Sequence, residues 1–307
     1  MEKKLLPMSG IISTFITPFT ENNQIDIDAL HKEIELGIQE GVSGFLIPCD
    51  ASESPCLTEE EMVLLVREAR QAAQDRCMLI SNVKATDRET RIKQCENYLA
   101  AGADALNLFL QPDPCRTEEE YLSAVRDIDE IHPRFMLLQD ADMVGSGLPI
   151  ETIVHAFEQF DSVRGVKIEV KDSGNKYTEL KRLTNDTLNI SCAKGRDQLI
   201  EAYDRGIHCF MPSGLFKIYV NSFKLYHEKS RDAARKLFYD MAPLMLFTCQ
   251  KDRINEYFHK SYFMRRGIFK NNYLRVPLEL DSYREKICQE MVDLALQIGD
   301  HMAEYWA

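Results

Sequence analysis

The sequence predicts an α/β fold, a TIM (β/α)8 barrel with a C-terminal helical appendix. Short apolar runs alternate with amphipathic segments through most of the chain, and successive runs begin roughly 20–35 residues apart, the length of one βα unit. A helix-ending glycine followed directly by a strand-like run recurs at Gly41, Gly102 and Gly206. The alternative is a doubly wound sheet, but no Gly-x-Gly-x-x-Gly phrase follows the first run. Eight units without a second domain therefore favour closure into a barrel.

Eight apolar runs, rich in β-branched and aromatic residues, are predicted as strands. They are Ile11–Phe15, Gly44–Ile47, Met78–Ser81, Ala105–Leu110, Phe135–Gln139, Val163–Val170, Leu188–Ser191 and Cys209–Met211.

Helices between most of these strands are predicted from their capping residues. Asp26 begins a helix that Gly41 ends, and Pro149 suits the first turn of another. Three capping boxes each begin a further helix. They are Thr58-x-x-Glu61, Thr86-x-x-Glu89 and Thr117-x-x-Glu120.

The alternation of predicted strands and helices ends at about Ser230. Helical patterns over residues 232–246, 255–267 and 280–303 follow one another with no strand between them. We therefore expect a barrel over residues 1–228 and a C-terminal helical region over residues 229–307 that packs on the barrel.

Composition and charge exclude several classes of partner. The 307 residues carry 37 Lys and Arg against 49 Asp and Glu, a net charge of −12, which argues against nucleic acid or an anionic membrane. No apolar stretch approaches the roughly 20 residues of a membrane span, and no signal peptide is visible. The nine cysteines are scattered without a Cys-x-x-Cys pair, which indicates reduced thiols in the cytoplasm. No His-x-x-x-His pair occurs, and we expect neither a metal nor a cofactor.

The predicted strand over residues 163–170 carries the clearest chemical signal. Because side chains alternate across a strand, Val166, Ile168 and Val170 share one face, while Lys167 and Glu169 share the other. The apolar face should meet the outer helices, which directs Lys167 and Glu169 into the barrel. Burial lowers the pKa of a lysine, and a neutral amine attacks carbonyl carbons. Lys167 is therefore a candidate Schiff-base nucleophile.

The alternative is that Lys167 and Glu169 form an interior ion pair with no catalytic role, since two residues along a strand span roughly 6.6 Å. Interior lysines are rare without a task, which favours the nucleophile. Two rival lysines, Lys171 after the same strand and Lys84 after the third strand, are expected at the surface.

Two further segments should reach the mouth of the barrel, where the active sites of such barrels lie. The loop over residues 48–58 offers Asp50, Ser52 and Glu53, and the segment over residues 139–142 offers Gln139 and two aspartates. An ordinary polar loop is the alternative for both segments. From the strand ends and these loops, we expect four residues to bind the substrate: Asp50, Ala51, Gln139 and Met211.

At these residues the sequence resembles the dihydrodipicolinate synthase / N-acetylneuraminate lyase family of class I aldolases, from Gly10 to about Leu246 and with a similar helical tail. The first strand ends in Thr-Pro-Phe at residues 17–19, and residues 53–61 read Glu-Ser-x-x-Leu-Thr-x-x-Glu. Residues 101–105, Ala-Gly-Ala-Asp-Ala, match the start of the fourth strand. Gly165-Val166-Lys167 resembles the Gly-Ile-Lys whose lysine forms the imine with pyruvate. The resemblance implies the barrel, a homotetramer and the Schiff-base role of Lys167.

The sequence departs from this family at the residues that handle the substrate. The Gly-Thr-Thr-Gly-Glu phrase, whose hydroxyls hold the keto acid's carboxylate, reads Cys-Asp-Ala-Ser-Glu at residues 49–53. Two like charges roughly 4 Å apart repel by about 1 kcal/mol even in water, so an ionised Asp50 should disfavour pyruvate in the usual pose. The Tyr-Asn-x-Pro phrase, whose tyrosine relays protons, begins here with Gln139. Glutamine is neither an acid nor a base, and Glu169 is a candidate to replace the tyrosine if burial raises its pKa.

Two functions remain open from the sequence. The first is a lyase, an aldolase or hydro-lyase, in which Lys167 forms an imine with a 2-oxo acid or a sugar-acid-like carbonyl compound, and dihydrodipicolinate synthesis itself is improbable. The second is a catalytically impaired small-molecule binding or regulatory protein on the same barrel. In both cases the partner is a small molecule, and the chain is expected to form a homo-oligomer, a dimer or a tetramer.

Overall fold

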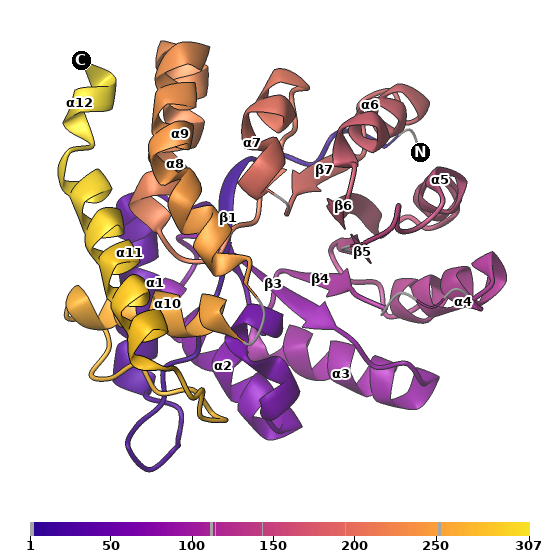
Figure 1. Cartoon of the computed structure of the whole chain (residues 1–307). Coiled ribbons are helices and arrows are strands. Elements are labelled where there is room, and N and C mark those ends of the chain that lie inside the picture. Colours follow the sequence, from indigo (N-terminus) through magenta and orange to yellow (C-terminus); the bar gives the residue numbers. More distant parts are fainter. Residues whose placement is uncertain (1–2, 111–112, 114, 143, 194, 251–252) are drawn as a thin grey trace.

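The structure is a computed structural model of the chain and describes residues 3–110, 113, 115–142, 144–193, 195–250 and 253–307. Within these residues eight parallel strands close a barrel in the order β1 to β8, with β8 paired to β1 (Figure 1). Helices cover the outside of the strands, and the fold is the predicted TIM barrel.

Each predicted strand is present, with small shifts at its ends. The strands are β1 Gly10–Thr14, β2 Gly44–Leu46, β3 Met78–Val83, β4 Ala105–Leu108, β5 Met136–Asp142, β6 Val163–Val170, β7 Asn189–Cys192 and β8 Cys209–Phe210. β5 extends beyond its prediction because Ala141 and Asp142 continue the pairing with Glu169 and Val170 of β6.

The helices of the barrel follow the strands in sequence. They are α1 Ile27–Glu40, α2 Glu59–Ala73, α3 Arg88–Ala101, α4 Glu118–Asp129, α5 Ile150–Gln159, α6 Ser173–Leu183, α7 Gly195–Asp204 and α8 Phe216–Lys224. Asp26 caps α1 and Gly41 ends it in a left-handed conformation, as predicted. The capping boxes of Thr58 and Thr117 are also present. Pro149 occupies the cap position of α5, one residue before the predicted first turn.

The predicted capping box at Thr86 is wrong. Asp87 caps α3 instead, and its side chain accepts a hydrogen bond from the Thr90 amide at 2.9 Å. Two good capping residues are adjacent here, and aspartate caps at least as well as threonine. The helix therefore begins one residue later than the pattern of Thr86 and Glu89 suggested.

The apolar core has two layers that follow the alternation of the strands. Residues such as Ile11, Val166 and Ile168 face outward and pack under the helices. Residues such as Ile12 and Leu137 face inward and fill the barrel below its mouth. This alternation places the polar residues of the same strands either in the barrel interior or at its mouth.

Where the structure describes it, the C-terminal region forms the helices α9 Arg231–Thr248, α10 Ile254–Arg265, α11 Ser282–Asp300 and α12 Ala303–Trp306 beside the barrel. They gather next to α1 and α8, on the side coloured orange to yellow in Figure 1. A π-helical turn over Leu225–Lys229 joins α8 to α9 and contains our proposed boundary at residue 228. Within the described residues no helix has the length and apolarity to cross a bilayer.

Candidate active site

A cavity of about 280 Å³ opens at the carboxyl ends of the barrel strands. This is the end of a TIM barrel at which active sites lie. The cavity is lined by the six residues to which the sequence analysis assigned catalysis or substrate binding: Asp50, Ala51, Gln139, Lys167, Glu169 and Met211.

Lys167 lies in the middle of β6 with its side chain directed into this cavity. Its backbone is in register with Gln139 of β5 and Ser191 of β7, and the residue is 5% exposed. The neighbours Val166 and Ile168 belong to the outer apolar layer. The amine is thus shielded from bulk water and still adjoins an open space.

Glu169 is the nearest acidic partner of this lysine. Its Oε2 lies 3.8 Å from Lys167 Nζ, near the outer limit for an ion pair. The Glu169 side chain is 29% exposed and lines the same cavity. The pair expected from the strand pattern therefore exists, and the cavity beside it leaves room for a ligand.

A row of amide side chains continues from Lys167 across β5, β4 and β3. Gln139 Oε1 accepts a hydrogen bond from Asn107 Nδ2 at 2.7 Å, and the same amide group of Asn107 donates to Asn82 Oδ1. Asn82 also lines the cavity. The row fixes the orientation of the Gln139 amide beside Lys167. Sequence analysis missed Asn82 and Asn107, although an asparagine inside an apolar strand run is a usable signal.

Asp50 forms an ion pair with Lys84 at the rim of the cavity. The side chain of Lys84 is 25% exposed and lies 5.5 Å from the centre of the Phe109 ring. Lys84, which we expected at the surface, is thus only partly exposed and approaches the mouth as a partner of Asp50. This counter-ion offsets the repulsion that Asp50 alone would exert on a carboxylate.

Ser52 and Glu53 do not join the cavity, contrary to our expectation for this loop. The Ser52 hydroxyl is buried and donates to the carbonyl of Phe15 at 2.8 Å. Glu53 turns toward the C-terminal region and pairs with Lys260. These two residues position the loop, while Asp50 and Ala51 face the cavity.

The two aspartates after Gln139 hold the β5–α5 loop. Asp140 is 1% exposed and accepts from Lys176 Nζ at 2.5 Å. Burial raises the pKa of Asp140, and Lys176 opposes that shift. Asp142 accepts from the amides of Val144 and Gly145, which lowers its pKa. Both carboxylates thus stabilise the loop and have a structural role.

The C-terminal region supplies a wall of the cavity that sequence analysis missed. Thr248 and Cys249 come from the end of α9, and Asn255, Glu256 and His259 come from α10. No local motif marks these residues, since their position depends on how α10 packs on the barrel.

Of the two titratable groups in this wall, His259 is buried and Glu256 is largely buried. Burial lowers the pKa of His259 to about 3, so the imidazole is neutral, and its Nε2 lies 2.7 Å from the carbonyl oxygen of Ser213. Burial likewise raises the pKa of Glu256. Among the described residues, no group of three or more His, Cys, Asp and Glu side chains is arranged to hold a metal ion.

The fold and the site together define a barrel protein with a shielded primary amine at its carboxyl-end mouth. Comparison with known proteins narrows this class. The model of the dihydrodipicolinate synthetase family matches residues 7–291, and the chain belongs to that family.

Two curated relatives, both 4-hydroxy-tetrahydrodipicolinate synthases, illustrate the distance within the family. That of Chlorobium phaeobacteroides is 28% identical over 195 residues, which is 63% of this chain and 64% of the relative. That of Sorangium cellulosum is 30% identical over 198 residues, 60% of this chain and 62% of the relative. The chain thus matches less than two thirds of the length of these relatives.

Solved structures agree in fold over nearly the whole chain. The 4-hydroxy-tetrahydrodipicolinate synthase of Methylacidiphilum fumariolicum has a TM-score of 0.86 at 18% identity and covers 98% of this chain and 100% of its own. The dihydrodipicolinate synthase of Rhodopseudomonas palustris has a TM-score of 0.84 at 21% identity, with coverages of 95% and 99%. At these identities the likeness supports the fold alone.

Proposed function

We propose that this chain is a Schiff-base-forming lyase in which Lys167 condenses with the carbonyl group of a 2-oxo acid or a sugar-acid-like substrate. The observation that carries the proposal is the position of Lys167. This residue is 5% exposed and lines a cavity of about 280 Å³. Membership of the dihydrodipicolinate synthetase family supports the same chemistry.

The reaction begins when the neutral Lys167 amine adds to the substrate's carbonyl carbon. Protonation of the carbinolamine hydroxyl group and loss of one water molecule then give the protonated imine. This cation withdraws electrons. In a dehydration, a base removes a proton from the carbon beside the imine, and the resulting enamine expels the hydroxyl group of the next carbon, which leaves as water with the C–O electron pair. In an aldol cleavage, a base removes the proton of that hydroxyl group, an aldehyde leaves, and the electron pair of the broken C–C bond forms the enamine. Protonation of the enamine carbon and hydrolysis of the imine then release the keto product and restore the amine.

Glu169 is the group that we assign to proton transfer. It lies 3.8 Å from the Lys167 amine and lines the cavity, whereas Gln139 has no titratable proton to relay. Glu169 accepts the proton that the amine loses as the carbinolamine forms, and it donates a proton to the carbinolamine hydroxyl group as water leaves. After bond cleavage the same group donates a proton to the enamine carbon.

Dihydrodipicolinate synthesis itself fits this site poorly. By its resemblance to the family, the sequence carries Asp50 and Ala51 in place of two hydroxyls for the substrate's carboxylate, and Gln139 in place of the tyrosine. Asp50 lines the cavity and pairs with Lys84. Lys84 provides a cation at the rim for a carboxylate in another pose. We therefore place the protein among the lyases of the family that act on a different carbonyl substrate.

Borohydride trapping tests this proposal directly. The protein is incubated with a panel of 2-oxo acids and keto sugar acids, reduced with borohydride and examined by intact mass spectrometry. We expect one irreversible adduct per chain with at least one compound, and none in Lys167→Ala. Lys171→Ala, which alters the exposed lysine after β6, is the matched control and should retain the adduct.

A catalytically impaired binding protein would give another result. No compound of the panel would form an adduct, while a non-carbonyl acid would raise the melting temperature of the protein. That pair of findings would overturn the lyase and favour the second function.

We also propose a cytoplasmic homo-oligomer, a dimer or a tetramer. The nine cysteines are free thiols, which fits a reducing compartment, and the resembling family is usually tetrameric. Sedimentation equilibrium of the purified chain measures the assembly directly.

A further inference from the structure

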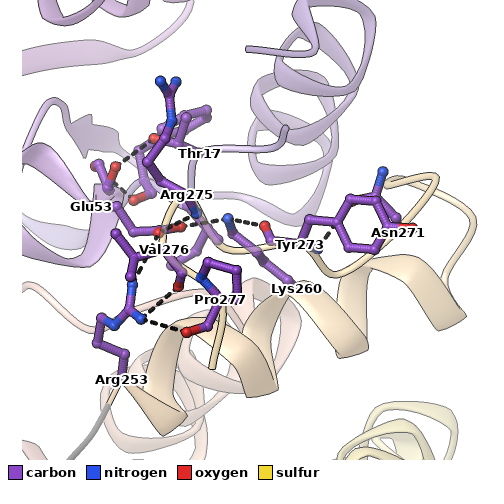
Figure 2. Close-up of polar contacts among 12 residues, drawn as sticks. Thr17, Glu53, Arg253, Lys260, Asn271, Tyr273, Arg275, Val276 and Pro277 are labelled. Carbon is purple, nitrogen blue, oxygen red and sulfur yellow. Dashed lines mark hydrogen bonds and ion pairs between the residues drawn. The ribbon is translucent and has the colours of Figure 1, made fainter. Parts of the chain in front are cut away.

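The loop that lines the cavity after β2 is held by the C-terminal region. Asp50 and Ala51 face the cavity, whereas the carboxylate of Glu53 turns away and is 1% exposed. Figure 2 shows that the Glu53 carboxylate meets Lys260 and Arg275, which lie more than 200 residues later in the sequence.

Both oxygens of the Glu53 carboxylate are engaged by this region. Oε1 accepts from Lys260 Nζ at 2.5 Å, and Oε2 accepts from the backbone amide of Arg275 at 2.9 Å. The guanidinium of Arg253 lies 3.8 Å from Oε2 and donates to the carbonyl of Val276 (Figure 2). Lys260, Arg275 and Arg253, all from the C-terminal region, thus hold the Glu53 carboxylate.

Lys260 is equally committed to this contact. Its side chain is 1% exposed, and its amine also donates to the carbonyl of Tyr273 at 2.6 Å and lies 4.2 Å from the centre of the Phe19 ring. Burial lowers the pKa of Lys260 to about 8, while Glu53, Glu256 and Glu33 act to raise it. The Lys260 amine and the Glu53 carboxylate thus form a buried ion pair.

The fixed position of Glu53 is transmitted to the cavity through a short, internally bonded segment. Glu53 has a φ of 58°, a left-handed conformation that is uncommon for a residue with a side chain. Its neighbour Ser52 accepts from the Cys49 amide at 3.2 Å, and the Ser52 carbonyl accepts from the Thr17 hydroxyl at 2.7 Å. Asp50 lies inside this bonded turn and cannot move independently of it.

We infer that Lys260 is a positioning residue of the active site. Through Glu53 it fixes the turn that presents Asp50 and Ala51 to the substrate, so that the C-terminal region sets substrate affinity while Lys167 performs the chemistry. The effect on substrate rests on the proposed function, but the effect on the turn does not.

Hydrogen–deuterium exchange of the whole chain tests the inference without a ligand. Lys260→Met keeps an unbranched side chain over Phe19 and removes the charge. We expect the backbone amides of residues 49–54 to exchange at least about tenfold faster in this variant, because the turn loses its anchor. Lys286→Met, at an exposed position of α11, is the matched control and should leave this exchange unchanged.

Two further variants, Glu53→Gln and the double variant Glu53→Gln/Lys260→Met, distinguish the loss of the anchor from a general loss of folding. The double variant leaves no unpaired charge between the two positions, so its melting temperature should recover relative to Lys260→Met. Its amides over residues 49–54 should still exchange fast. If these amides exchange at the wild-type rate in all three variants, the inference is overturned.

Borohydride trapping with the 2-oxo acid or keto sugar acid of the panel that labels the wild type most fully separates positioning from general damage. In Lys260→Met we expect the half-saturating concentration of this compound to rise at least about tenfold at unchanged maximal incorporation. A lower maximum at an unchanged half-saturating concentration would mean a merely structural role and would contradict the inference. If the wild type forms no adduct with any compound, the proposed function fails, and the exchange measurement alone decides the positioning role.

Discussion

Two inward-facing residues of β6, Lys167 and Glu169, carry the proposed chemistry. The alternation of side chains along the strand predicted that both point into the barrel, and the structure places both in one cavity. The alternation could not predict which neighbours they meet. The Asp50–Lys84 pair joins two loops, and the row of Asn82 and its neighbours crosses three strands.

Replacing Glu169 by glutamine tests the assignment of the proton carrier. Glu169→Gln keeps the shape of the side chain and removes its carboxyl group, the acid–base function. We expect kcat to fall roughly 100-fold or more, because general acid–base catalysis contributes about that much, while the Lys167 adduct still forms. Steady-state kinetics with the substrate found in the trapping panel measure this. Unchanged turnover would assign proton transfer to another group.

His259 should make the fold sensitive to acid. Burial holds its pKa at about 3, below the value of 6.5 that it takes in the unfolded chain. Between these values the unfolded chain binds one more proton at this residue than the folded chain, so stability falls as the pH drops from about 6.5 toward 3.

His259→Gln removes this titration and keeps a donor for the Ser213 carbonyl. We expect the pH dependence of the free energy of unfolding to become shallower by about 1.4 kcal/mol per pH unit between roughly pH 4 and pH 6. Urea unfolding at several pH values, with the wild type in parallel, measures the difference. Equal slopes would show that His259 is protonated in the folded state.

At the scale of single elements, the sequence predicted the type and order of the barrel's strands and helices. Capping residues such as Asp26, Thr58 and Thr117 also marked where helices begin. The start of α3 was missed by one residue, because Thr86 and Asp87 are both good caps and only the backbone conformation decides between them.

This correction can be measured with two neighbouring variants. Asp87→Ala should lower the free energy of unfolding by about 1 kcal/mol, since the Thr90 amide loses its acceptor. Thr86→Ala, one residue earlier on the surface, should change it by less than about 0.5 kcal/mol. Urea denaturation of both variants gives the two values. The reverse order would restore Thr86 as the cap.

At the scale of the whole molecule, the C-terminal region and the barrel share one apolar core. Buried residues of α9, α10 and α11, such as Leu237, Phe258 and Val292, belong to the same cluster as the outer layer of the barrel. The sequence predicted these helices but not the contact of Lys260 with Glu53. The periodicity of apolar residues predicts which face of a helix is buried, but it does not predict which part of the chain packs against that face. Here the partner of Lys260 lies 207 residues away in the sequence.

The shared core predicts cooperative unfolding. Trp306, the only tryptophan, lies in α12 and donates its indole N–H to Asn221 of α8 at 2.8 Å, so its fluorescence reports on the C-terminal region. We expect fluorescence and far-UV circular dichroism to give the same urea midpoint. A separate, earlier fluorescence transition would show that the C-terminal region unfolds independently of the barrel.

Peptide mapping of the borohydride-reduced adduct tests the central claim most directly. Two other lysines are alternatives to Lys167, namely Lys84, which pairs with Asp50, and Lys171, which follows β6. The structure encloses Lys167 beside the cavity. We predict that the added mass lies on the peptide containing Lys167 and that the other two lysines stay unmodified. An adduct on Lys84 or Lys171, with Lys167 unmodified, would contradict the account.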